Sequence, residues 1–185
     1  MKTISVIVVF ILFGFGFTKN VTKVVITNKS EVTIKGKSNI NSFECKYNSD
    51  FIEDEIHVSI SRNNSKIVLD GAKICIKSNG FDCAQKIITK DFKSLLRADE
   101  NPYIVINVKE LENVKDNLIA KLNVKIVGIE NEYTVPVSYN HTSNNVKGKL
   151  RLNINDFKLK SPKKLLGMVV VNENVDIHFN LFLQY

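Results

Sequence analysis

The chain has 185 residues, of which 44% are apolar and 24% charged, with 8 Gly and 3 Pro. These values are typical of one globular domain and exclude collagen-like, disordered and multi-span membrane proteins. The formal net charge of +7 comes almost wholly from lysine, because arginine stands only at positions 62, 97 and 151. Surfaces that read bases depend on bidentate arginine, so this charge predicts a plain solvated surface and no nucleic-acid partner.

The beginning of the chain has the pattern of a secretory signal. A lysine precedes an apolar run from Ile4 to Phe17, which is shorter than the roughly 20 residues of a comfortable membrane span. Small residues near its end favour cleavage after Gly16, with cleavage after Thr18 as the second choice, and an uncleaved anchor is the alternative. We expect a signal peptide over 1–18, a mature domain over 19–185, and a periplasmic or secreted protein.

Alternation of apolar and polar residues dominates the rest of the chain. From Leu118 to Ile126 the even positions are apolar, whereas Lys121, Asn123 and Lys125 share the opposite face. This period of two is typical of antiparallel strands with one solvated face. It predicts clear strands over 30–37, 55–61, 117–128, 146–156 and 175–183, and weaker ones over 23–26, 43–47, 66–69, 72–77, 103–109 and 133–139.

The stretch from Cys83 to Glu100 breaks this alternation. Its apolar residues follow helical spacing and share one face: Ile88, Phe92, Leu95 and Leu96. The residue before a proline is biased away from helix, so the helix should end near Arg97, before Pro102. We expect it to cap one mouth of the fold or to pack outside as a flap.

So many long strands must close on themselves or split into two sheets, because open sheet edges aggregate. The mature chain is long enough for a single closed barrel of about eight main strands. A two-sheet sandwich is the competing architecture, but the long strands of the C-terminal half favour the barrel. The expected fold is therefore an all-β, antiparallel, lipocalin-like barrel with one short inserted helix.

Several stretches of the chain resemble one known family in order and spacing. They are SEVTIKGKSNINSFECKY, FDCAQKIITKDFKSLLRADENPYIVINV, LNVKIVGIENEYTVPVSY, VKGKLRLNINDFKLKSP and VNENVDIHFNLFL. Together they resemble the YceI-like family over essentially the whole mature chain. The resemblance implies an exported barrel that binds a polyisoprenoid or related amphiphilic lipid, and a homodimer. Many relatives carry a His and an aromatic residue where Asn39 to Phe43 stands, so no head-group contact carries over.

The inward-facing positions are the candidate ligand contacts. They are Ile34, Phe43, Tyr47, Ile104, Ile106, Leu122, Tyr133, Val135, Tyr139, Leu152 and Phe179 on the strands, with Phe92 on the helix. Plain core packing is the alternative for each, since apolar residues usually fill cores. The tyrosines stand out because a buried phenol needs a hydrogen-bond partner, which a lipid head group could supply.

Three cysteines in an exported chain leave at least one outside a disulfide. By strand phase Cys45 faces inward and Cys75 outward, and Cys83 opens the helical segment. We predict a Cys45–Cys83 disulfide. Three reduced thiols are the alternative, and a Cys75–Cys83 link would contradict the phase argument.

Catalytic and metal-binding patterns find no support in the sequence. The three histidines lie far apart, and no metalloprotease, phosphate-loop or nucleophile-elbow motif is present. We therefore expect neither an enzyme nor a metal or other cofactor. The favoured function is a lipid-binding barrel without covalent chemistry, and the alternative is a packed structural or protein-interaction barrel.

Overall fold

The computed structural model of the protein describes residues 21–52, 54–115, 117–161, 163–164 and 169–185. The expected signal peptide, with both of its possible cleavage points, lies outside the described residues. The strands are β1 (Val21–Ile26), β2 (Glu31–Lys37), β3 (Ser42–Tyr47), β4 (Asp54–Asn63), β5 (Lys66–Asp70), β6 (Lys73–Lys77), β7 (Phe81–Asp82), β8 (Tyr103–Val114), β9 (Asn117–Ile126), β10 (Ile129–Asn140), β11 (Asn145–Asn153), β12 (Lys163–Lys164), β13 (Val169–Val170) and β14 (Asn174–Gln184). They are joined by helix α1 (Lys86–Leu95) and the 3₁₀ turns η1 (Ser49–Phe51), η2 (Ser78–Gly80) and η3 (Ile154–Phe157).

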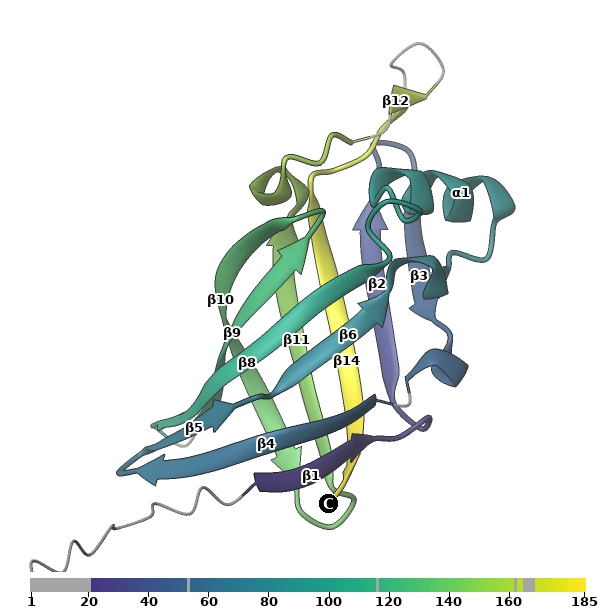
Figure 1. Ribbon diagram of the computed structural model, residues 1–185. Helices are drawn as coiled ribbons and strands as arrows, with labels where there is room; N and C mark the ends of the chain where they lie inside the picture. The colour runs from purple at the N-terminus through teal and green to yellow at the C-terminus, as the bar shows by residue number, and fades with distance from the viewer. Residues whose placement is uncertain (1–20, 53, 116, 162, 165–168) are drawn as a thin grey trace, which may run out of the picture.

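Antiparallel pairing closes the sheet into a barrel (Figure 1). In the described residues, eight strands form a ring in the order β1, β4, β5, β8, β9, β10, β11 and β14, and β14 pairs again with β1. A closed ring removes the free edges that an open sheet would leave. The predicted all-β barrel with one inserted helix is therefore confirmed.

Strand β14 has three partners, because two strands share one of its edges. Strand β11 covers one edge along nine residue pairs, whereas β2 and β1 cover successive parts of the other. The link between β1 and β2 is held to β14 by Thr27, whose N–H donates to the Phe182 carbonyl, and by Ser30, whose Oγ accepts the Phe182 N–H. Strands β3 and β7 continue from β2 as a branch beside the ring.

Strand β8 is longer than the alternation predicts, because a bulge changes its phase. Its even residues face inward as far as Val108, which pairs with Leu122, and the register then shifts before Glu110. Beyond the bulge Leu111 faces inward opposite Ala120. An extra residue reverses the alternation, which is why the predicted strand over 103–109 stops at the point of the bulge.

The chain leaves β11 earlier than predicted. Residues Ile154 to Phe157 form the 3₁₀ turn η3 instead of continuing the strand to 156. The Asn153 side chain accepts the Asn155 N–H at 2.9 Å and so caps the turn. Phe157 is fully buried in consequence, and η3 contacts β10 and β11 at one end of the barrel.

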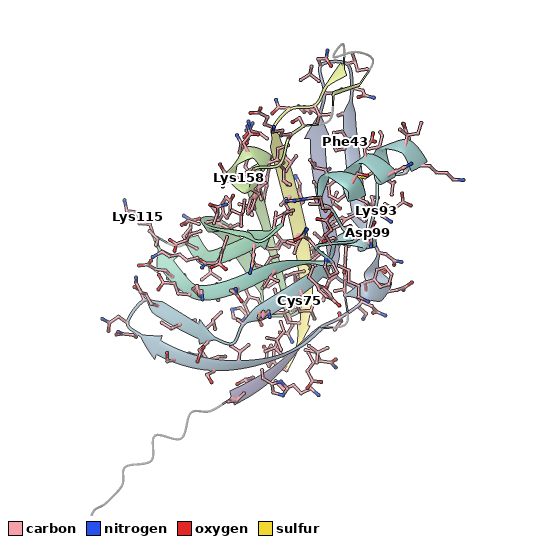
Figure 2. The ribbon with its side chains drawn as sticks, turned by 45° about the horizontal axis from the view of Figure 1, so that its top comes forward. Phe43, Cys75, Lys93, Asp99, Lys115 and Lys158 are labelled. Atoms are coloured by element: carbon pink, nitrogen blue, oxygen red, sulfur yellow. A yellow bond between two sulfur atoms is a disulfide. The ribbon has the colours of Figure 1, made fainter. Side chains whose placement is uncertain are left out.

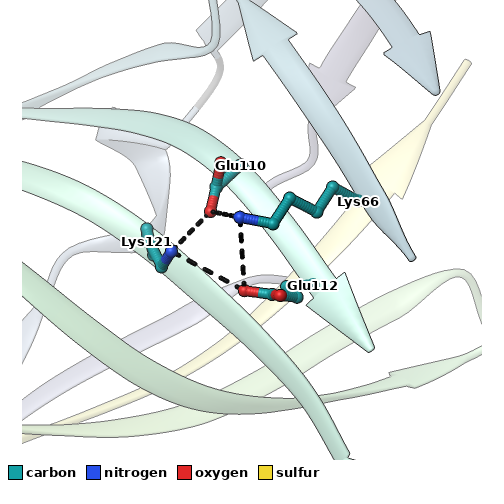
Figure 3. A network of polar contacts seen from close by, with 4 residues as sticks. All are labelled: Lys66, Glu110, Glu112 and Lys121. Atoms are coloured by element: carbon teal, nitrogen blue, oxygen red, sulfur yellow. Dashed lines mark hydrogen bonds and ion pairs between the residues drawn. The ribbon is translucent and has the colours of Figure 1, made fainter. Parts of the chain in front are cut away.

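A polar network ties three strands together on the outside of the barrel (Figure 3). Glu110 on β8 contacts Lys121 on β9 at 2.6 Å and Lys66 on β5 at 3.3 Å, and Glu112 lies near both lysines. The hydrogen bond from Lys121 lowers the pKa of Glu110 below its usual value. Exposed ion pairs stabilise little individually. The main effect of the network is therefore to link β5, β8 and β9 in their observed register beside the bulge.

Candidate functional site: the inner face of the barrel

Most of the residues that the sequence indicates lie on ring strands, and the others lie on the adjoining elements: Ile34 on β2, Phe43 and Tyr47 on β3, and Phe92 on α1. Among them, Ile34, Tyr47, Ile104, Leu122, Val135 and Leu152 are buried in one apolar cluster, and Phe43, Phe92, Ile106, Tyr133 and Phe179 pack against it partly buried. Strand alternation therefore brings these residues together, as a period of two requires. Their contact with a ligand stays a prediction.

Packing is tight on one part of this face and looser on another. The exposed fractions of Val135 and Leu152 are 1% and 2%. By contrast, every residue of β14 from Val175 to Leu183 is only partly buried, including those that face inward. The ladder fixes that direction, because Ile177 lies between Ile34 and Leu150, both of them core residues. The looser part of the lining therefore follows β14.

Two glycines on the inner face lie beneath phenylalanine rings. Gly36 on β2 is directly opposite Phe43 on β3, and Gly148 on β11 is directly opposite Phe179 on β14. A Cβ atom at either glycine would overlap the ring of its partner, so only glycine lets the ring lie over the backbone. Sequence reasoning missed both glycines, although each stands between two lysines in a strand pattern, where a lone glycine indicates a close approach.

The phenol of Tyr47 already has partners within the protein. Its hydroxyl accepts the Lys77 N–H at 3.0 Å and donates to the Phe51 carbonyl at 3.4 Å. The ring lies 5.0 Å from that of Phe81. Tyr47 therefore joins β3 to the neighbouring turns, and its hydroxyl does not depend on a lipid head group.

Tyr133 lies at the end of the barrel that η3 covers. Its ring stacks on Phe157 with centroids 6.3 Å apart, and its hydroxyl donates to Asp156 Oδ2 at 3.3 Å. Burial, with a smaller contribution from the Asp156 charge, raises the pKa of Tyr133 to about 12. The phenol is therefore a neutral hydrogen-bond donor at physiological pH.

Tyr139 lies near the opposite end of β10. Its hydroxyl is 3.0 Å from both Asn144 Oδ1 and the Tyr185 hydroxyl, and His141 packs edge-on against its ring. The hydrogen bond with Tyr185 raises the pKa of Tyr139. The two tyrosines thus place polar groups at the two ends of one inward strand face.

A disulfide anchors the α1 segment to the barrel. Cys45 on β3 and Cys83, just before α1, are joined by it, as strand phase predicts, and both are buried. Phe92 of α1 then packs edge-on against Phe81 of β7, with ring centroids 5.3 Å apart. Cys75 lies outside the disulfide on β6, opposite Val105, and is half-buried. The helix therefore packs beside β3 and β7 (Figure 1).

Metal-ligating clusters and membrane-spanning helices are absent from the described residues. In this part of the chain no group of three or more His, Cys, Asp or Glu could hold a metal ion. Nor does it contain a helix that is long and apolar enough to cross a bilayer. What the barrel offers is an enclosed apolar face with a few phenols at its ends, which suits apolar ligands.

Comparison with known proteins identifies the family. The model of the YceI-like domain matches residues 24–183. The crystal structure of BcnA from Burkholderia cenocepacia is similar with a TM-score of 0.66 at 16% identity, covering 86% of this chain and 99% of that one. A YceI protein from Campylobacter jejuni gives a TM-score of 0.43 at 12% identity, over 68% and 80% of the two chains. None of the curated proteins matches this sequence. With the family model spanning nearly the whole described barrel, the chain belongs to the YceI-like family.

Proposed function

We propose that this protein is an exported lipid-binding protein that holds an isoprenoid or similar amphiphilic lipid inside its barrel, without covalent chemistry. The family resemblance gives the ligand class, and the N-terminal apolar run supports export to the periplasm or beyond. The buried Cys45–Cys83 disulfide is in keeping with an oxidising compartment.

The observation that carries the proposal is the incomplete burial of the inner face along β14. Phe179 and Leu181 face inward and yet remain partly exposed, whereas Val135 is fully buried. Accessible apolar surface on these inward-facing side chains would gain free energy if a lipid chain covered it, by about 25 cal/mol for each Å² removed from water.

The residues near this surface suit a hydrocarbon chain. On the inner face, Phe179 is flanked by Val32 on β2, and Leu181 is opposite Val146 on β11. These side chains carry no charge or hydrogen-bonding group, so they recognise apolar bulk and not a particular functional group. A polar head is then best placed at an end of the barrel, where the phenols of Tyr133 and Tyr139 lie.

Native mass spectrometry and organic extraction of the purified protein test the proposal. We expect a co-purifying lipid in the wild type and its loss in Val146→Trp, because the larger side chain fills the space beside Leu181. Lys147→Trp is the matched control, since the next residue lies on the outer face and is exposed; it should retain the lipid. Absence of lipid from the wild type, together with failure to take up an added isoprenoid, would favour the packed structural barrel.

The homodimer implied by the resemblance is also proposed here. Sedimentation velocity of the full mature chain measures it directly. A single species at the dimer mass is expected, and a monomer across the micromolar range would contradict it.

A further inference from the structure

A cleft lies outside the barrel, between α1 and the turns η1 and η2. Its volume is about 970 Å³, within the range of small-molecule sites. Its lining comprises Asn48, Phe51, Asn79, Gly80, Phe81, Asp82, Ala84, Lys86, Thr89, Lys90, Lys93, Ser94, Arg97, Ala98, Asp99 and Glu100. None of the residues proposed to contact lipid in the barrel is among them, so the cleft is a separate site.

One wall of the cleft is a basic stripe, defined here as Lys86, Lys90, Lys93 and Arg97. The spacing of four and three residues places Lys86, Lys90 and Lys93 on one side of α1. Arg97 lies two residues beyond the end of the helix, with a φ of 46°, and also lines the cleft. The apolar side of α1 faces the protein instead, where Ile88, Phe92 and Leu95 are partly buried against the core. The helix therefore turns its cations toward the cleft.

These cations have no carboxylate partners within the described chain. None of the four takes part in an ion pair between described residues, unlike Lys66 on β5 and Lys121 on β9. Asp82, which also lines the cleft, is occupied by the Ala84 N–H and the Thr89 hydroxyl. Asp99 and Glu100 also line the cleft, so its four cations exceed its three carboxylates by one. A basic stripe without ion pairs to described residues still favours an anionic ligand over a cationic one.

The other wall of the cleft offers apolar surface beside this charge. Phe51 is 42% exposed, and Lys77 Nζ lies 4.7 Å from the centre of its ring. Phe81 also lines the cleft, but it is only 3% exposed, so Phe51 provides most of the apolar surface. An anion with an organic part would place its charge on the basic stripe and its apolar part against these rings.

We infer that the cleft beside α1 binds a phosphate-bearing anion. Lysine ammonium groups at intervals of one helical turn, with one arginine fork, match the several oxygens of a phosphate or diphosphate. The phosphate comes either from a soluble compound or from a lipid head group at a membrane surface. This inference does not depend on lipid binding within the barrel.

Titration calorimetry with inorganic pyrophosphate and flotation with phosphatidylglycerol vesicles test the two sources separately. The variant Lys90→Glu/Lys93→Glu reverses two charges of the basic stripe. The control Lys115→Glu/Lys158→Glu makes the same change of net charge at exposed positions on the other side of the molecule (Figure 2). Phosphatidylcholine vesicles control for binding to lipid in general.

We expect the basic-stripe variant to weaken binding of at least one probe by roughly tenfold or more, and the control variant to change it by less than about threefold. Binding of pyrophosphate alone identifies a soluble phosphate, and binding of anionic vesicles alone identifies a head group. Equal weakening by both variants, or binding of neither probe by the wild type at physiological salt, overturns the inference. Lipid retention in the barrel, measured on the same samples, should be unchanged, so failure of this site is distinguishable from failure of the proposed function.

Discussion

Phe157 and Phe179 are phenylalanines of the same barrel with different surroundings. Phe157 lies in the turn η3, is fully buried and stacks on Tyr133. Phe179 lies on β14, covers Gly148 and remains partly accessible. A phenylalanine side chain is therefore fully buried at one end of the barrel and partly accessible on strand β14. Apolar character alone does not distinguish core from ligand-binding surface, because the difference lies in what covers the ring.

The largest expected effect is on stability at the sealed end. Phe157→Ala should lower the free energy of unfolding by about 3–5 kcal/mol, because it leaves a cavity among buried neighbours. Phe179→Ala should cost about 1–2 kcal/mol, because its ring is already partly accessible. Urea unfolding of both variants measures the difference. Equal losses would contradict the distinction between the two regions.

The disulfide comes next, since it holds the α1 segment against the packed cluster. Its closed loop spans a sequence separation of 38 residues, for which the chain-entropy model gives about 3–4 kcal/mol. Cys83→Ser should therefore lower the free energy of unfolding by up to this amount, with Cys75→Ser as the matched control because that residue lies outside the bridge. The same loss in both variants would show that the disulfide does not stabilise the fold.

The smallest effect concerns the ionisation of Tyr133. Its pKa is raised from 10.0 to about 12 in the folded protein, chiefly by burial. A raised pKa contributes stability that is complete below pH 10 and is lost as the pH rises toward 12. The free energy of unfolding should fall more steeply over this window in the wild type than in Tyr133→Phe. Parallel curves from chemical denaturation at each pH would contradict the shifted ionisation.

Much of the fold can be predicted from the sequence because alternation is a local property. The period of two locates every ring strand, although β9 ends at Ile126, before the predicted 128, and β10 begins at Ile129 instead of 133. The predicted Cys45–Cys83 disulfide is present. Prediction fails where a local exception decides the structure. The bulge before Glu110 extends β8 in the opposite phase, and the Asn153 side chain ends β11 in favour of η3. The bulge and the cap leave the overall pattern of apolar residues unchanged. That pattern therefore predicts neither of them.

The candidate site is less predictable, because it depends on how neighbouring strands fill space. Alternation identifies Leu122 and Phe179 equally as inward residues, but only the three-dimensional packing separates the buried one from the partly accessible one. The close approach of Phe179 to Gly148 likewise requires the register between β11 and β14. The basic stripe of α1 is periodic in the sequence, yet its facing cleft depends on the distant turn η1.

The threefold pairing of β14 has a consequence for the order of assembly. Its partners include Val25, near the start of the described chain, and residues of β2 and β11. Until Asn174 to Gln184 have been synthesised, these three strands each present an edge without its hydrogen bonds. Because contacts over such sequence separations form slowly, we expect the barrel to close late in folding, and a chain cut before β14 to leave these three edges open to pairing with other chains.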